Sequence, residues 1–217
     1  LQFEQLNNGI DDNVFLSFGF KGVFSPFRFT GEFMIDDIQI DNKLPADREP
    51  PEIGWFFSGE FGTNISNRWL TTKLAYEGVT NWTYNQVNSR NRYINDGYPI
   101  GSQYGNDYDN ITFSTEYWYS PMLIIGLKES ITRLGEGRID SEWTEPWMED
   151  ENYEENFPSG VVEKNIASSF YVEGYYSSRV NYNLEFKFQS FNNYMNIKSK
   201  KKNIFEMRCD ITFLLNL

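Results

Sequence analysis

The segment FEMRCDITFLLNL, residues 205–217, decides the fold class of this chain. Every second position in it is apolar, namely Phe205, Met207, Cys209, Ile211, Phe213, Leu215 and Leu217. The intervening positions are polar apart from Leu214: they are Glu206, Arg208, Asp210, Thr212 and Asn216. Because successive side chains of a β-strand point to opposite faces, this segment predicts a strand with one apolar face and one charged face.

The same alternation recurs along the chain and predicts nine strands of about the length that a tilted membrane strand needs. They cover residues 13–21, 27–36, 53–61, 70–77, 111–119, 122–132, 166–176, 180–189 and 205–217. In the sixth of these, Lys128 and Glu129 fall on opposite parities, which predicts a bulge or an early exit of the strand from the bilayer. The predicted connections alternate between short turns and longer loops, and the longest loops are residues 78–110 and 133–164.

Two-sided strands joined by alternating short and long connections are typical of a membrane-spanning β-barrel. The fold prediction is therefore all-β: an antiparallel transmembrane β-barrel, or roughly half of a larger one, with short periplasmic turns and long extracellular loops. We interpret residues 1–217 as a single outer-membrane domain. A soluble β-sandwich would also alternate, but it would not need aromatic residues on one face of nearly every strand.

Composition favours strands over helices as the membrane-crossing elements. Aromatic residues make up 18% of the chain, yet its mean hydropathy is −0.57. The longest apolar run, residues 122–127, is far shorter than the roughly 20 residues of a spanning helix. Residues 1–8 lack the basic and apolar regions of a signal peptide, and single-chain bacterial barrels have even strand counts. Either a leader has been removed or the chain is a fragment, and we expect a fragment that lacks amino-terminal sequence.

The residue types that are rare or absent exclude several function classes. The chain contains no histidine, which removes Ser-His and Cys-His catalysis and His-dependent metalloproteases, so we expect no enzymatic activity and no cofactor. A net charge of −12 argues against nucleic acid as a partner, because phosphate binding needs clustered Lys and Arg. The single cysteine, Cys209, lies on the apolar parity of its strand and is expected to be inert.

The most specific sequence segment in the chain is YINDGYPIGSQYGNDYD, residues 93–109. It resembles the pattern Y-x-x-x-G-x-P-[LI]-G-x-x-x-G-x-D-x-D of the capsule assembly protein Wzi family. Three further segments are similar to motifs of that family: GEFMIDD at 31–37, YEGVTNWTY at 76–84 and RLGEG at 133–137. The resemblance extends from about residue 13 to the end of the chain and corresponds to the carboxyl-terminal half of such proteins.

This resemblance implies about nine strands of a barrel of roughly eighteen in the bacterial outer membrane. It also implies a non-enzymatic lectin that helps assemble or attach capsular or other surface polysaccharide. The implied partners are that polysaccharide and outer-membrane lipid or lipopolysaccharide, and the chain is expected to be a monomer. Two alternatives remain open from the sequence, an outer-membrane porin or solute channel and a soluble β-sandwich lectin.

The loop at 78–110 combines aromatic rings with amides and carboxylates, which are the groups that hold sugars. The candidate polysaccharide-binding residues are Glu77, Trp82, Tyr84, Arg92, Tyr93, Tyr98, Asp107 and Asp109. The same loop can also be interpreted as a packed segment that plugs the barrel mouth. A second loop, residues 140–155, has eight acidic residues and no basic one. It is interpreted either as a solvated loop or as a Ca²⁺ or Mg²⁺ site, with Glu149, Asp150 and Glu151 as candidates.

Overall fold

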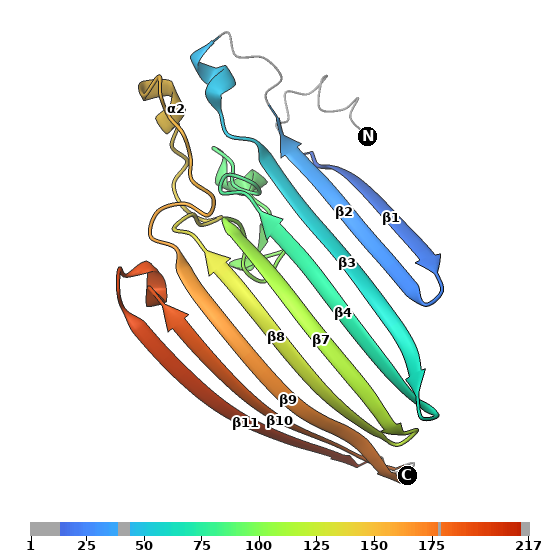
Figure 1. The fold of residues 1–217 in the computed structure, drawn as a ribbon. Helices are drawn as coiled ribbons and strands as arrows, with labels where there is room; N and C mark the ends of the chain where they lie inside the picture. The colour runs from blue at the N-terminus through green and yellow to red at the C-terminus, as the bar shows by residue number, and fades with distance from the viewer. Residues whose placement is uncertain (1–13, 39–43, 178, 214–217) are drawn as a thin grey trace.

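The computed structural model describes residues 14–38, 44–177 and 179–213, and within these ranges the chain is all-β. Nine long strands form one antiparallel sheet in chain order (Figure 1). They are β1 (Leu16–Phe24), β2 (Phe27–Asp37), β3 (Glu52–Ile65), β4 (Arg68–Val79), β7 (Tyr108–Ser120), β8 (Leu123–Leu134), β9 (Glu163–Ser177), β10 (Val180–Asn192) and β11 (Lys201–Phe213). All nine predicted strands are therefore confirmed. Leu214, Leu215, Asn216 and Leu217 of the terminal segment, and Asn13 of the first, lie outside the described residues.

Short and long connections alternate along the sheet, as predicted. Strands β1 and β2, β3 and β4, β7 and β8, and β9 and β10 are each separated by only two residues. The other connections are longer and gather at the opposite end of the sheet (Figure 1). They contain the short helices η1 (Pro45–Arg48), η2 (Ser89–Asn91), α2 (Pro146–Glu149) and η3 (Tyr194–Asn196), and the small sheet of β5 (Ile94–Asn95) and β6 (Tyr98–Pro99).

The turn between β3 and β4 shows how the sequence sets the register. Ser66 and Asn67 both have positive φ, 53° and 63°, which is the backbone twist that a two-residue hairpin turn requires. From this turn the ladder runs without a break from Ile65 paired with Arg68 up to Gly54 paired with Val79. A slip of one residue would move every aromatic side chain of β3 to the other face, so the turn and the two-sided pattern specify the same register.

The two faces of the sheet differ in chemistry across its whole width. One register row of one face crosses eight strands with charged or hydroxyl side chains: Arg28, Glu60, Lys73, Ser114, Lys128, Ser169, Lys187 and Glu206. The other face exposes large apolar side chains on every strand, including Phe20, Phe29, Phe57, Leu74, Phe113, Leu127, Phe170, Phe188 and Phe205. We refer to these as the polar face and the apolar face.

The buried core is small and lies at the end of the sheet that carries the long loops. Val79, Tyr84, Tyr108 and Ile139 form its centre. Partly buried side chains pack around them: Phe15, Met34, Tyr93, Ile94, Tyr104 and Leu134. The core thus joins the polar face of the sheet to the β4–β7 and β8–β9 loops, and it fixes the position of those loops.

The bulge expected at Lys128 and Glu129 is wrong. Strand β8 pairs with β9 without interruption from Leu123 to Leu134, and with β7 through Lys128 and Glu129 in register. Glu129 remains on the apolar face because its carboxylate accepts a hydrogen bond from the Ser168 hydroxyl at 2.6 Å on the neighbouring strand. Because Ser168 provides this hydrogen bond, β8 keeps its regular pairing at Glu129.

The nine strands form an open sheet, not a cylinder closed on itself. Strands β1 and β11 are its two edges. In an antiparallel sheet with an odd number of strands the two edge strands run in the same direction, so no antiparallel ladder can join them. In the described part of the chain, no helix has the length and apolar character needed to cross a membrane.

Candidate functional site

The β4–β7 loop, residues 80–107, packs onto the sheet and is held there by backbone and side-chain hydrogen bonds. The Thr80 hydroxyl accepts from the Ile53 backbone N–H at 2.9 Å and donates to the Pro51 carbonyl at 2.8 Å. Further along, the Tyr84 backbone N–H donates to the Asp36 carboxylate at 2.9 Å. Tyr84 is only 7% exposed, so this loop is a packed segment with a defined position.

A cavity of about 600 Å³ lies between this loop and the polar face, and we call it the loop cavity. On the sheet side, Glu32, Phe56 and Glu77 occupy one register row on β2, β3 and β4. The two carboxylates therefore flank Phe56, with backbones two strand spacings or roughly 10 Å apart. The loop contributes Tyr84, Tyr93, Gly101, Ser102 and Gln103, and the remaining lining includes Phe15, Ser17, Met34, Val79 and Tyr108.

Three aromatic rings of this lining pack against one another. The ring centroids of Phe15 and Tyr84 are 5.6 Å apart, those of Phe15 and Tyr93 are 5.0 Å apart, and those of Tyr84 and Tyr93 are 5.3 Å apart. Burial, followed by the proximity of Tyr93, Asp36 and Glu32, raises the pKa of Tyr84 to about 12. The phenol is therefore neutral at physiological pH and acts as a hydrogen-bonding, ring-bearing wall.

The loop cavity has the chemistry of a carbohydrate subsite. A sugar ring has an apolar C–H face that packs on aromatic rings, and its hydroxyls donate strong hydrogen bonds to carboxylates. An apolar concavity with a few convergent polar groups is also the usual form of a small-molecule site. Among the described residues of the lining, Glu32, Glu77, Ser102 and Gln103 supply such groups.

The structure distributes the predicted site residues over several places. Glu77, Tyr84 and Tyr93 line the loop cavity together. Arg92 instead donates from Nε to the Gln86 carbonyl at 3.2 Å and from its guanidinium to the Asp140 carbonyl at 3.0 Å, which ties two loops together. Tyr98 is 76% exposed at the tip of the β5–β6 hairpin.

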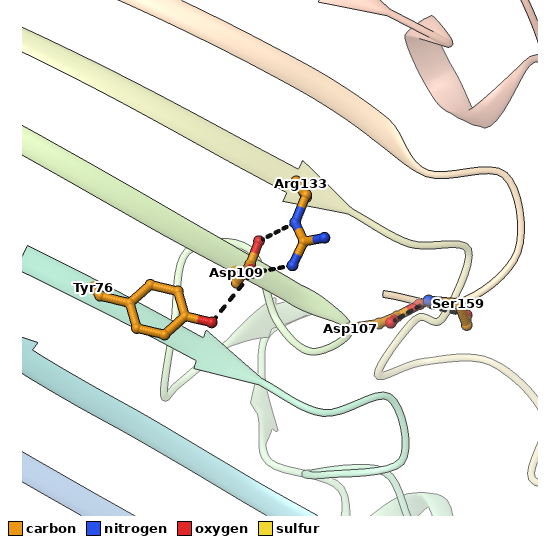
Figure 2. Close-up of polar contacts among 5 residues, drawn as sticks. All are labelled: Tyr76, Asp107, Asp109, Arg133 and Ser159. Atoms are coloured by element: carbon orange, nitrogen blue, oxygen red, sulfur yellow. Dashed lines mark hydrogen bonds and ion pairs between the residues drawn. The ribbon is translucent and has the colours of Figure 1, made fainter. Parts of the chain in front are cut away.

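Asp107 makes structural hydrogen bonds between two loops. It is fully buried, and its carboxylate accepts hydrogen bonds from the Ser159 N–H at 2.8 Å and the Ser159 hydroxyl at 2.6 Å (Figure 2). It also accepts one from the Gly137 N–H at 2.8 Å. A Cβ on Gly135 would lie 2.0 Å from an Asp107 carboxylate oxygen, so the glycine permits this close approach. Asp107 thus uses its oxygens to join the ends of the two longest loops.

Asp109 also makes structural contacts. On β7 it accepts from Nε and a terminal nitrogen of Arg133 on β8, at 2.8 and 2.5 Å, and from the Tyr76 hydroxyl on β4 at 3.3 Å (Figure 2). The guanidinium donates to both carboxylate oxygens, which is the strongest geometry for such a pair. This three-strand contact lies on the apolar-face parity, outside the loop cavity.

Trp82 lies in a second aromatic cluster, between the β4–β7 and β8–β9 loops. Its ring centroid is 5.4 Å from that of Trp143 and 5.1 Å from that of Trp147. One oxygen of Glu155 accepts from the Trp82 indole N–H at 3.0 Å, the Asn81 amide at 2.6 Å and the Tyr153 hydroxyl at 3.1 Å. Burial raises the pKa of Glu155, although the hydrogen bonds from Asn81, Tyr153 and Trp82 oppose that shift.

The acidic loop of residues 140–155 is thus anchored by Trp147, which is 2% exposed. The candidate ligands Glu149, Asp150 and Glu151 are exposed at and beyond the end of α2. Within the described ranges, no group of three or more Asp, Glu or Cys side chains is placed to hold a metal ion.

Several cavity residues were not among the predicted site residues. Glu32 and Phe56 lie on the polar parity of their strands, so the alternation places them on the correct face. Their grouping with Glu77 depends on the register of three strands, which the sequence does not give. Ser102 and Gln103 enter through loop packing and carry no local signal, whereas Phe15 lies directly before β1 on the parity of the polar face.

No family model, curated protein or solved structure matches this chain.

Proposed function

We propose that this chain forms part of the wall of a bacterial outer-membrane β-barrel that binds capsular or other surface polysaccharide without catalysing a reaction. The proposed family is that of the capsule assembly protein Wzi, on the motifs quoted above. The observation that carries this proposal is the two-sided sheet, whose apolar face is exposed on all nine strands. Monomeric soluble proteins rarely expose a continuous apolar surface of that extent, whereas lipid covers it in a membrane barrel.

The height of the apolar face agrees with the thickness of a membrane. On β7, apolar-face positions run from Asp109, in its ion pair with Arg133, to Tyr119, whose ring is 4.0 Å from the Arg68 guanidinium. These ten residue steps span about 33 Å along the strand, or about 25 Å at a tilt of about 40°. Charges at both ends and apolar side chains between them, Ile111 and Phe113 among them, are what a bilayer-spanning strand requires.

Closure of the barrel would come from additional strands at β1 and β11. Unpaired backbone groups at a sheet edge are not tolerated inside a bilayer, so both edges need partners. Because these edges run in the same direction, an odd number of further antiparallel strands joins them, and nine would complete a barrel of eighteen. In this arrangement the polar face lines the interior and the long loops face the cell exterior.

Polysaccharide binding is supported by the loop cavity. It opens at the loop end of the polar face, and it combines aromatic rings, carboxylates and the Gln103 amide, which suit a sugar unit. A loop without packing contacts samples many conformations. This loop instead has a defined conformation, because hydrogen bonds of Asp36, Asp107 and Thr80 hold it in place. Preorganisation of this kind lowers the entropic cost of binding a flexible glycan.

A solute channel is the second candidate, and one observation favours it. A further hollow of about 590 Å³ lies lower on the polar face and is lined by charges of both signs, including Arg28, Glu60, Lys73 and Glu116. A charged, water-filled lumen is typical of porins. In the lectin proposal this hollow is part of a lumen that the loops obstruct.

Two measurements on the purified protein test the proposal. Glycan-array binding together with low solute flux in a liposome-swelling assay supports the lectin. Large flux without glycan binding supports the channel. Recovery of the protein from plain buffer, without detergent, would contradict both the membrane lectin and the membrane channel and would support a soluble lectin.

A further inference from the structure

Among the described residues, the loop cavity carries two carboxylates and no compensating cation. Glu32 and Glu77 line it from β2 and β4, and none of the described lining residues is Lys or Arg. Glu77 accepts a hydrogen bond from the Asn110 amide at 3.2 Å, but a neutral amide leaves its negative charge in place. Glu32 is exposed and makes no side-chain ion pair among the described contacts.

The lysine that lies near the cavity is held by other groups. Lys73 Nζ is 5.9 Å from the centre of the Phe56 ring, on the side away from the loop. It is also 3.6 Å from a Glu60 carboxylate oxygen, and Glu60 makes a second ion pair with Arg28. The positive charge of Lys73 is therefore directed to this ion-pair network and not to the two cavity carboxylates.

The aromatic lining adds to the same electrostatic preference. Phe56 lies between the two glutamates in the register row, and the rings of Tyr84 and Tyr93 form the loop side. The face of an aromatic ring carries partial negative charge and attracts cations. Carboxylates on either side of such rings favour a bound cation and oppose a bound anion.

We propose, on the basis of the polysaccharide-binding function above, that the loop cavity selects a sugar unit with a free, positively charged amino group and rejects a uronate. The ammonium lies between the Glu32 and Glu77 carboxylates, and the sugar ring packs on Phe56. N-acetylation removes the charge and leaves the ring, so an acetylated unit binds more weakly. A uronate brings a third carboxylate into the cavity and is excluded by repulsion.

The test uses the full chain in detergent micelles and calorimetry with three tetrasaccharides. These are the glucosamine tetramer, its fully N-acetylated counterpart and the galacturonate tetramer, at physiological ionic strength. We expect the glucosamine tetramer to bind about tenfold more tightly than the acetylated one, and the galacturonate tetramer to show no binding. Glu32→Gln and Glu77→Gln each lower the affinity for the glucosamine tetramer by roughly fivefold to tenfold.

Glu206→Gln is the matched control, because it removes one negative charge from the polar face on β11, far from the cavity in the strand order. An equal loss in this control would show bulk attraction to an acidic protein and would overturn the inference. Tighter binding of the acetylated or the galacturonate tetramer would also overturn it, while the polysaccharide-binding function would stand. If all three tetramers and a broad glycan array failed to bind, both this inference and the polysaccharide-binding function would be overturned.

Because Glu32 makes no hydrogen bond among the described contacts, Glu32→Gln keeps the test valid if Glu77→Gln disturbs Asn110.

Discussion

Asp109 and Arg133 face each other across β7 and β8 and join through two hydrogen-bonded atom pairs, at 2.8 and 2.5 Å. The Asp109 side chain is only 8% exposed, whereas that of Arg133 is 44% exposed. The pair marks the level at which apolar side chains of the apolar face give way to charged ones. The pair therefore lies where the proposed lipid-covered surface ends and the long loops begin.

Removal of Arg133 should therefore destabilise the sheet. We expect Arg133→Ala to lower the free energy of unfolding by about 2 kcal/mol, because Asp109 is left largely buried without its cation. Urea unfolding in lipid vesicles measures this change. Arg208→Ala is the control, since the Arg208–Asp210 pair is 71% and 45% exposed and should contribute less than about 1 kcal/mol. Equal effects of the two substitutions would contradict a special role for the Asp109 pair.

Asp107 should hold the two longest loops together. Asp107→Ala removes the acceptor of three hydrogen bonds in a fully buried place, and we expect a local loss of roughly 2–3 kcal/mol. Hydrogen exchange at residues 80–107 and 135–162 should rise while the sheet stays protected. Asp107 has a φ of 55°, which Asn tolerates better than Ala, so Asp107→Asn separates backbone strain from the lost carboxylate. Unchanged exchange in both variants would refute this role.

Gly126 should be needed for a contact that crosses a strand. The Tyr171 ring of β9 lies over Gly126 of β8, where an added Cβ would be 2.0 Å from the ring, and its hydroxyl donates to Glu116 of β7 at 2.7 Å. We expect Gly126→Ala to displace the ring and to cost about 1–3 kcal/mol. Gly62→Ala is a matched control, because nothing lies within 4 Å of the added Cβ there. Denaturation midpoints compare the two, and similar losses would show a general glycine effect.

Glu155 should make the packing of the acidic loop depend on pH. Its pKa is raised by burial, so the folded loop binds a proton more tightly than the unfolded loop does. The stabilising contribution is thus fully present below the ordinary glutamate pKa and is lost as the pH rises through the raised value. Urea-induced release of Trp82, Trp143 and Trp147, followed by fluorescence, should become easier as the pH rises above the ordinary glutamate pKa of about 4.3.

The Glu155→Gln variant should flatten this pH dependence and stabilise the loop near neutral pH, since a neutral amide retains an oxygen acceptor. Glu154→Gln serves as the control because Glu154 is exposed beside it. A pH dependence that survives Glu155→Gln would assign the effect to another group.

Much of the fold was predictable because it follows from side-chain parity. The alternating pattern of residues 205–213 and its repeats located all nine strands and the order of short and long connections. The same rule fails at Glu129, where a charged residue on the apolar parity predicts a bulge that the structure does not contain. The Ser168 hydroxyl on the next strand supplies its partner, and parity within one strand contains no information about that.

The candidate site was less predictable because it depends on contacts between distant segments. Asp107 and Trp82 have the residue types of a sugar site, yet Ser159 and Glu155 on another loop engage their polar groups. Conversely, Glu32 joins the cavity only because β2, β3 and β4 bring it into one row with Glu77. Loop packing and strand register, not local composition, decide which polar groups face a ligand.

The central claim is that one face of this sheet contacts lipid and the other contacts water. A nitroxide scan of β7 in lipid bilayers, in a Cys209→Ser background, tests it through oxygen and water-soluble nickel accessibility. Labels at Ile111, Phe113 and Thr115 should be accessible to oxygen and protected from nickel, and labels at Thr112, Ser114 and Glu116 should show the reverse. Uniform nickel access along the strand, or alternation that is also present in plain buffer without lipid, would contradict the claim.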